Sequence, residues 1–229
     1  MKILAIDTSA LTATAAILSG GIILGEMSVT TSLTHSQTIM PMIDELLLKT
    51  SLNINDIDLF ACSEGPGSFT GLRIGIGTVK GLAYGCNKKV CAVSTLEALA
   101  YNIAFSDYII SPVMDARRGQ VYNALYKWVN GELLCLEEPR ALSVEELCAS
   151  LNENVIFVGD GVKPYKEKIS EIMGSRAHFA PPQHCLQRAA SVAVAALNKE
   201  SIDAASLSAV YLRKPQAERE REEKNSERN

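Results

Sequence analysis

The alternation of apolar and polar positions in the first thirty residues predicts three short strands. An apolar run from Ile3 to Ile6 ends at the polar turn Asp7-Thr8-Ser9. Two further β-like runs, 12 to 18 and 22 to 29, flank the pair Gly20-Gly21, which is typical of a tight hairpin turn. The predicted order is therefore strand, acidic turn, hairpin.

The same order returns near the middle of the chain. An apolar run from 108 to 114 ends at the second acidic turn, which begins with Asp115. The run from 121 to 129 then reaches Asn130-Gly131, a strong turn pair, and 132 to 136 returns from it. We interpret the two halves as a tandem duplication that is visible in the order of elements and not in residue identity.

Two such halves predict an α/β protein with a duplicated actin-like fold, in which each lobe has a mixed sheet and helices. We place the N-terminal lobe at 1–104 and the C-terminal lobe at 105–214. The alternative is a single Rossmann-like domain, which would place a helix and not a hairpin after its first strand. The charged segment 215–229 has no apolar run and is predicted to be a disordered tail or a solvated helix.

The stretch from 64 to 85 predicts a loop followed by a helix. Gly65-Pro66-Gly67 breaks the preceding element, and Ser68 or Thr70 can cap the helix. Apolar residues then recur at helical spacing, at Phe69, Leu72, Ile76, Val79 and Ala83.

Glycines occur inside this helix at two four-residue spacings, Gly71 with Gly75 and Gly77 with Gly81 and Gly85. Each costs roughly 1 kcal/mol against alanine, so their repetition indicates close approach of another backbone. Either the helix lies deep in its own domain, or the small residues face a second chain.

Further helices are predicted at 35–48, behind a capping box at Thr34 to Gln37, and at 94–102, 143–151 and 170–173. The Ala-rich segment 188–199 is predicted to be a helix that packs back on the first lobe.

Composition excludes some functions. The chain of 229 residues has a net charge of −4, which argues against direct binding of nucleic acid through a broad basic surface. Its six cysteines are scattered without metal or redox spacing, which predicts reduced, mostly buried thiols. No signal peptide or membrane span is evident, so we expect a soluble cytoplasmic protein.

The acidic turns are the strongest candidates for chemistry. In an ATPase, Asp7 and Asp115 would hold magnesium or orient water across the cleft between the lobes. Alternatively, each accepts amide hydrogen bonds in its own turn. No Walker-type phosphate loop is present.

Other catalytic arrangements find no support. The three histidines lack metal-ligand spacing, so no metal site is predicted. Ser68 follows Gly-Pro-Gly and does not lie in a Gly-x-Ser-x-Gly elbow. Arg73 with Lys80, and Arg117-Arg118, are either solvated or form an anion site or partner contact.

Four segments together resemble the TsaB family, formerly called YeaZ, over residues 1 to about 215. They are Met1-Lys-Ile-Leu-Ala-Ile-Asp-Thr-Ser9, Ser63-Glu-Gly-Pro-Gly-Ser-Phe-Thr-Gly-Leu-Arg-Ile-Gly75, Val93-Ser-Thr-Leu-Glu-Ala98 and Met114-Asp-Ala-Arg-Arg-Gly-Gln-Val-Tyr122. The resemblance implies the duplicated actin-like fold and a subunit that binds and activates the catalytic paralogue TsaD. With the ATPase TsaE, that pair would make threonylcarbamoyladenosine beside the anticodon of tRNA, which this chain would reach only through the complex.

The chain differs from TsaD where TsaD carries its chemistry. TsaD has a His-Met-Glu-Ala-His metal motif, whereas this chain has Thr95-Leu-Glu-Ala-Leu99. TsaD follows its first strand with Glu-Thr-Ser-Cys-Asp-Asp, whereas this chain has Asp7-Thr-Ser-Ala-Leu-Thr12. The resemblance therefore implies a non-catalytic subunit with no peptidase activity.

The resemblance also implies a partner surface on the helices 35–48 and 69–84, used by TsaD or, in its absence, by a second copy of the chain. The implied contact residues are His35, Ile39, Met42, Ile43, Leu46, Phe69, Leu72, Arg73, Ile76, Gly77, Lys80, Gly81, Ala83 and Tyr84. No cofactor of its own is expected, which leaves open a nucleotide at the interface with TsaD or in a vestigial cleft at Asp7, Thr8, Ser9 and Asp115. The alternative function is a nucleotide-hydrolysing or kinase-like phosphotransferase.

Overall fold

In the computed structural model, which describes residues 1–213, the first half of the chain forms a five-stranded sheet in the order β3-β2-β1-β4-β5. Its strands are β1 (Lys2–Asp7), β2 (Thr12–Ser19), β3 (Ile22–Thr30), β4 (Leu59–Gly65) and β5 (Lys89–Ser94). β1 pairs antiparallel with β2 and parallel with β4. Because a hairpin follows β1 directly, the Rossmann-like alternative is wrong. The predicted tail 215–229 lies outside the described residues.

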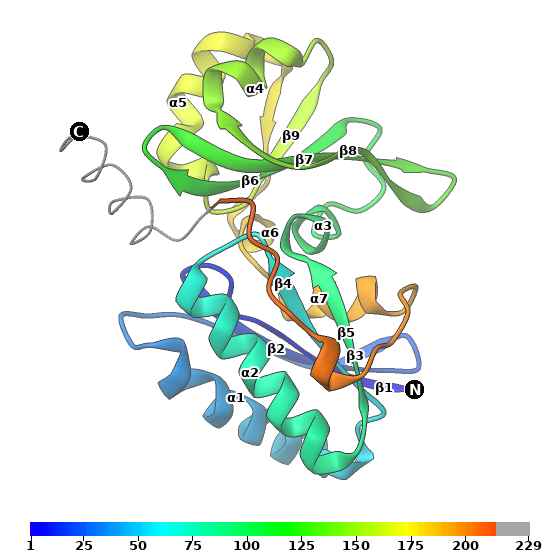
Figure 1. Cartoon of the computed structure of the whole chain (residues 1–229). Helices are drawn as coiled ribbons and strands as arrows, with labels where there is room; N and C mark the ends of the chain where they lie inside the picture. The colour runs from blue at the N-terminus through cyan, green and yellow to red at the C-terminus, as the bar shows by residue number, and fades with distance from the viewer. Residues whose placement is uncertain (214–229) are drawn as a thin grey trace, which may run out of the picture.

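The second half repeats this sheet. Its strands are β6 (Ile109–Arg117), β7 (Gln120–Val129), β8 (Glu132–Ser143), β9 (Val155–Val158) and β10 (Ala177–Phe179). Their order is β10-β9-β6-β7-β8, and β6 pairs antiparallel with β7 and parallel with β9. Each strand of the second sheet therefore has the place of its counterpart in the first. The predicted duplication and the actin-like fold of two lobes are confirmed (Figure 1).

Seven α-helices are described, and most begin and end where the sequence predicts. They are α1 (His35–Thr50), α2 (Phe69–Cys86), α3 (Thr95–Ala100), α4 (Val144–Ser150), α5 (Val162–Met173), α6 (Pro182–Cys185) and α7 (Ala189–Ala196). A capping box at Thr34 opens α1 as expected, and a second capping box at Ser143 opens α4. α5 is longer than the predicted 170–173, because Pro164 lies in the first turn of the helix, where a missing N–H leaves no hydrogen bond unmade.

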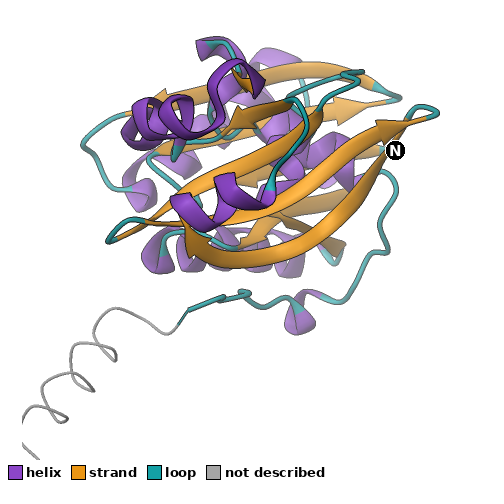
Figure 2. Ribbon diagram, turned by 90° about the horizontal axis from the view of Figure 1, so that it is seen from above, coloured by secondary structure: helices purple, strands orange, loops and turns teal. Residues whose placement is uncertain are grey.

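Alternate residues of β1 point to opposite faces of the first sheet. Leu4 and Ile6 join the core beneath α1 and α2, whereas Ile3 and Ala5 join the core beneath α7. Figure 2 shows helices above and below the strands. Because α7 consists only of alanine, valine and serine, it lies close to the sheet and is buried nearly all round.

α7 is held by the first lobe, although it follows the second lobe in sequence. The N–H of Ala189 donates to Thr14 Oγ1 at 3.2 Å, and the N–H of Ala190 donates to a carboxylate oxygen of Glu26 at 3.0 Å. These two side chains satisfy amides that a helix leaves free at its N-terminus. The prediction that 188–199 packs back on the first lobe is confirmed, so the range 105–214 includes a segment that belongs with the first lobe.

The chain then runs along α2 toward the second lobe. We call residues 202–213 the C-terminal strap. It begins at a bridge between Ile202 and Val90 at the free edge of β5, and it buries Ala204 and Leu207 against the α2 side of the first lobe. Figure 1 shows the strap in orange to red beside α2.

The second sheet also has two covered faces. One packs on α4 and α5, through residues such as Val113 and Phe157. The other packs on α3, where Leu96 and Leu99 meet Ile110 and Met114. α3 therefore fills the space between the lobes.

The two glycine sets of α2 have different surroundings. A Cβ at Gly71 would overlap the carbonyl oxygen of Thr8, and one at Gly75 would lie 2.5 Å from Thr8 Oγ1. A Cβ at Gly77 or Gly81 would meet no atom within 4 Å. Both explanations offered by the sequence therefore apply, one to each set: the first set packs inside the lobe, and the second is open.

This difference predicts opposite effects of alanine at the two sets. Gly71→Ala should lower the free energy of unfolding by roughly 1–3 kcal/mol, because the new methyl group displaces backbone. Gly77→Ala should raise it by roughly 0.5–1 kcal/mol, because alanine is the better helix former and has room. Urea denaturation at low protein concentration measures the free energy of unfolding of both variants. Equal effects would contradict the assignment of the two faces.

Candidate functional site

The first acidic turn is closed within its own lobe. Asp7 is 1% exposed, and its Oδ1 accepts hydrogen bonds from the Ser9 backbone N–H at 2.8 Å and the Ser9 hydroxyl at 2.6 Å. Its Oδ2 accepts a third hydrogen bond from Ser63 Oγ at 2.5 Å. Burial raises the pKa of Asp7, and the hydrogen bonds from Ser63 and Ser9 oppose that rise. Both carboxylate oxygens therefore have partners inside the lobe.

The second acidic turn has the same internal pattern. Oδ1 of Asp115 accepts from the backbone N–H of Arg117 at 2.8 Å and from the Tyr165 hydroxyl at 3.0 Å. Arg117 and Arg118 both have positive φ, as a tight β6–β7 turn requires. Unlike Asp7, Asp115 is exposed.

These contacts bear on the two interpretations of the aspartates. In a nucleotide site, turn amides donate to phosphate oxygens. Here the N–H groups of Ser9 and Arg117 donate to the aspartate two residues earlier. The geometry favours the interpretation in which each aspartate stabilises its own turn.

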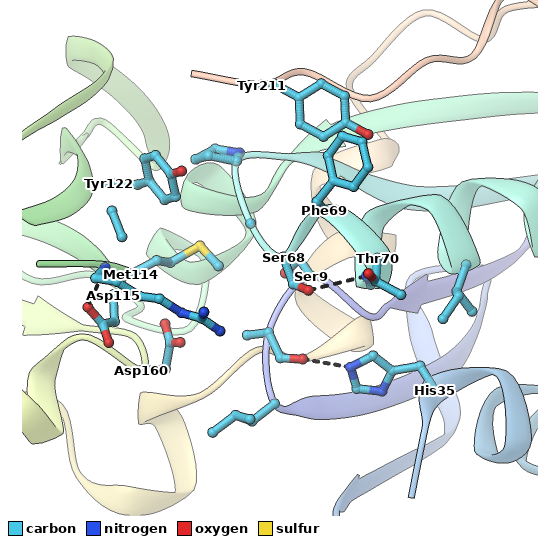
Figure 3. A pocket seen from close by; sticks show the side chains of 18 of the residues that line it. Ser9, His35, Ser68, Phe69, Thr70, Met114, Asp115, Tyr122, Asp160 and Tyr211 are labelled. Atoms are coloured by element: carbon cyan, nitrogen blue, oxygen red, sulfur yellow. Dashed lines mark hydrogen bonds between the residues drawn. The ribbon is translucent and has the colours of Figure 1, made fainter. Parts of the chain in front are cut away.

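A cleft of about 910 Å³ separates the lobes. Figure 3 shows Ser9, Ser68 and Thr70 on one side and Met114, Asp115, Tyr122 and Asp160 on the other. Of the predicted cofactor residues, Ser9 and Asp115 line the cleft. Thr8 is buried, and its hydroxyl donates to the Gly71 carbonyl at 2.8 Å, while Asp7 faces Ser63. The duplication therefore brings the two turns to one cleft, but not the two carboxylates.

Asp160 is the cleft residue that the sequence analysis missed. It follows β9 in Gly159-Asp160-Gly161, the place where the first lobe has Gly65. Burial and, to a smaller extent, the negative charge of Asp115 raise the pKa of Asp160 to about 6. Its Oδ1 is buried and has no hydrogen-bond partner among residues 1–213. A carboxyl between two glycines at the end of an apolar strand was the signal that could have identified it.

Ser68 and His35 also line the cleft but have structural partners. Ser68 Oγ accepts the Gly71 N–H at 3.3 Å as the N-cap of α2, which confirms the predicted cap. His35 Nε2 lies 2.7 Å from the Ala10 carbonyl oxygen.

Burial raises the pKa of Cys91 and of Cys148 to about 11, which keeps both thiols protonated and unreactive at neutral pH.

Cysteine burial is less uniform than predicted. All six thiols are free, as expected, and Cys62, Cys91 and Cys148 are buried. Cys135 is exposed, because it lies on β8 at the edge of the second sheet.

The predicted partner surface on α1 and α2 needs a correction. Seven of its residues are buried in the first lobe and cannot contact a partner without unfolding. They are Ile39, Met42, Ile43, Leu46, Leu72, Ile76 and Ala83. These positions have helical spacing because they face the lobe's own core.

The remaining predicted residues do reach the surface or its border. Arg73, Gly77, Gly81 and Tyr84 are exposed, whereas His35, Phe69 and Lys80 are half-buried. Tyr84 is 64% exposed. Gly85 is also exposed and extends the row of open glycines by one turn. We call Gly77, Gly81, Tyr84 and Gly85 the α2 ridge.

The two cations of α2 contact the C-terminal strap. Lys80 Nζ donates to the Ala205 carbonyl at 3.2 Å, and Arg73 Nε donates to the Tyr211 hydroxyl at 3.3 Å. Both cations therefore have a contact within the chain itself, and whether they also contact a partner stays a prediction. Arg117 and Arg213 also line the cleft.

The described part of the chain contains neither a candidate metal site nor a candidate membrane span. In residues 1–213, no group of three or more His, Cys, Asp or Glu side chains is placed to hold a metal ion. Over the same range, no helix has both the length and the apolar character of a membrane span.

Comparison with known proteins relates these features to one family. A family model described as "TsaD: tRNA N6-adenosine threonylcarbamoyltransferase" matches residues 25–220. The tRNA threonylcarbamoyladenosine biosynthesis protein TsaB of Bacillus subtilis is 34% identical over 221 residues, which cover 95% of this chain and 96% of that protein.

Two solved structures from Pseudomonas aeruginosa have the same fold. YeaZ has a TM-score of 0.78 at 28% identity and covers 92% of this chain and 99% of its own. A protein described as having similarity to peptidase YEAZ has a TM-score of 0.78 at 27% identity, with 93% and 99% covered.

The raised pKa of Asp160 predicts a pH-dependent cost to stability. The native state holds the Asp160 proton more tightly than the unfolded state, so stability falls as the pH rises from about 4 to above 6. Asp160→Asn should therefore be more stable than the wild type at pH 8 by roughly 1–3 kcal/mol, and the difference should vanish near pH 4.

Chemical denaturation over this pH range measures the difference. Asp115→Asn keeps a side-chain oxygen that accepts the Arg117 N–H but removes the negative charge near Asp160. At pH 8 it should therefore raise the free energy of unfolding by less than Asp160→Asn does. A difference that does not change with pH would contradict the raised pKa of Asp160.

Proposed function

Since the chain belongs to the TsaB family of tRNA threonylcarbamoyladenosine biosynthesis proteins, we propose that it is a non-catalytic subunit that binds and activates the catalytic subunit TsaD. Together with the ATPase TsaE, the pair transfers a threonylcarbamoyl group from its adenylate to the adenosine beside the anticodon. This chain reaches tRNA only through the complex, in the cytoplasm.

The observation that carries this proposal is the α2 ridge. Glycine in an exposed helix costs stability, and three open glycines at four-residue spacing bring no gain to the free chain. Small residues in a row let a second helix approach closely. Exposed Tyr84 beside them, and Met40 and Leu48 at 40% and 70% exposure on α1, add apolar area for a partner.

TsaD is the occupant that we propose for the α2 ridge. In the absence of TsaD, the same ridge pairs two copies of this chain, because a two-fold axis matches one exposed surface with itself.

The surroundings of α3 support a non-catalytic role. Where TsaD carries its metal motif, this chain has Thr95 and Leu99, which are 0% and 1% exposed. Leu99 packs in the core between the lobes. Neither side chain offers a ligand of the kind that iron or zinc prefers. The sequence positions of the metal ligands are thus used for packing.

Peptidase activity, which the description of one solved relative suggests, is not part of the proposal. Ser68 caps α2, and His35 lies against the Ala10 carbonyl oxygen. No hydrogen bond joins these two side chains in residues 1–213. A serine peptidase requires a nucleophile and a base within reach of each other.

A nucleotide-hydrolysing or kinase-like phosphotransferase is the second candidate, because the cleft lies between two acidic turns. The hydrogen bonds that Ser9 and Arg117 donate to their own aspartates weaken it. We propose that the chain has no cofactor of its own and that any nucleotide lies at the interface with TsaD.

Reconstitution tests the proposed function. Unmodified tRNA is incubated with the threonylcarbamoyl-adenylate source, TsaD and TsaE from the same organism, with or without this protein. Threonylcarbamoyladenosine should form only when this protein is present, and none should form when it is added without TsaD. Mass spectrometry of the digested tRNA measures the product.

Equal modification without this protein would contradict an obligatory subunit. Stabilisation of the free chain by Mg-ATP, with hydrolysis lost in Asp115→Asn, would favour the phosphotransferase instead.

Bulky residues on the α2 ridge should block docking. Gly77→Leu and Gly81→Leu should each weaken TsaD binding by roughly tenfold or more, because a side chain then separates the packed helices. Both chains should remain folded, because the new side chains point into open space.

Calorimetric titration with TsaD measures the affinity. Glu167→Leu, which places the same side chain at an exposed position of α5, is the control and should bind as the wild type does. A folded Gly81→Leu variant with unchanged affinity would remove the α2 ridge from the interface.

A further inference from the structure

The first residues of the C-terminal strap are hydrogen-bonded to β5 and buried in the first lobe. Ile202 exchanges two backbone hydrogen bonds with Val90, at 2.8 and 3.0 Å. Ala204 and Leu207 are 6% and 1% exposed within the core of the first lobe. Residues 202–207 are therefore part of the first lobe.

Residues 208–213 are held differently. The N–H of Val210 donates to the Glu64 carbonyl at 2.8 Å. The strap passes so close to the end of β4 that a Cβ on Gly65 would overlap the Val210 carbonyl oxygen. Yet Val210 and Tyr211 remain 43% and 39% exposed.

Tyr211 contacts the N-terminal part of α2. Its ring lies 4.9 Å from the ring of Phe69, and its hydroxyl accepts from Arg73 Nε. The Arg73 guanidinium lies 3.8 Å from the Phe69 ring centroid, so the three side chains form one cluster. Exposed contacts of these kinds are individually weak.

Two residues further on, the strap reaches the other lobe. Arg213 Nη1 donates to the Ala116 carbonyl at 3.2 Å, beside the second acidic turn. Tyr211, Leu212 and Arg213 also line the cleft. One short segment thus joins α2 of the first lobe to β6 of the second across the cleft.

Arg73 connects this segment to the α2 ridge. It lies one helical turn before Gly77, and residues four apart share a face of a helix. A partner helix that packs closely on Gly77 therefore covers Arg73 as well. The docked partner and Tyr211 therefore compete for contact with the Arg73 guanidinium.

We propose that residues 208–213 form a latch that ties the two lobes together in the free chain and is released when a partner docks on the α2 ridge. This regulation rests on the proposed function, because it needs a partner on α2. Loss of the Tyr211 grip frees Arg213 from Ala116, so docking on the first lobe loosens the second lobe and widens the cleft.

The latch can be tested first in the free protein. Hydrogen exchange of the Val210 amide reports whether residues 208–213 are seated on β4. If the contacts open together, Arg213→Ala and Tyr211→Ala should each speed this exchange by roughly tenfold, which is about 1.4 kcal/mol. Ser208→Ala, at an exposed strap position, is the matched control and should leave it unchanged. Arg213→Ala with wild-type exchange would overturn the latch.

The second test adds TsaD. A closed latch opposes docking, so Arg213→Ala and Tyr211→Ala should bind TsaD roughly 3- to 10-fold more tightly than the wild type and Ser208→Ala. Binding to the wild type should also speed Val210 exchange. Unchanged or weaker affinity, or slower exchange in the complex, would overturn release by docking.

The two proposals fail in different ways. If the wild type does not bind TsaD, the proposed function and release by docking both fall, whereas the free-protein exchange still decides whether the strap couples the lobes. If the wild type binds and the strap variants behave like Ser208→Ala, only the latch falls.

Discussion

The close contact between the first acidic turn and the start of α2 determines much of this structure. Thr8 donates to the Gly71 carbonyl, and the Ser68 N–H donates to the Ser9 carbonyl at 2.7 Å, so turn and helix meet backbone to backbone. Only glycine at 71 permits this distance. The contact buries Asp7 and sets the wall of the cleft. It also fixes the rotation of α2, and therefore which glycines face the solvent.

The sequence predicted the features that depend on neighbouring residues. Hairpin turns, helix caps and the repeated order of strands follow from local patterns, and the structure contains them. The two glycine sets of α2 could not be assigned, because their spacing is the same and only tertiary packing separates them. Leu72 and Ile76 were expected at the partner surface for a related reason: an apolar helical face does not state whether its own sheet or another chain will cover it. Asp160 was missed because its surroundings come from segments distant in the sequence, which include Asp115 and Gln187.

The cleft retains the geometry of an actin-like fold with its polar groups used internally. The amides of Ser9 and Arg117 donate to Asp7 and Asp115 and are not available to a phosphate. Asp160 instead holds a buried, unpaired oxygen at a cost to stability near neutral pH. The amides of both acidic turns therefore have hydrogen-bond partners without a bound nucleotide, and the two lobes keep their structure. This agrees with a subunit whose contribution is a surface.

That surface is not independent of the lobes, because the two sides of α2 have different contacts. Its inner glycines seat the helix on the first acidic turn, and its outer glycines leave an open ridge. Arg73, one turn before Gly77 on the outer side, holds the strap that reaches Ala116 of the second lobe. Any partner that covers the ridge therefore acts on the strap, and through it on the cleft, even though it touches neither lobe's acidic turn.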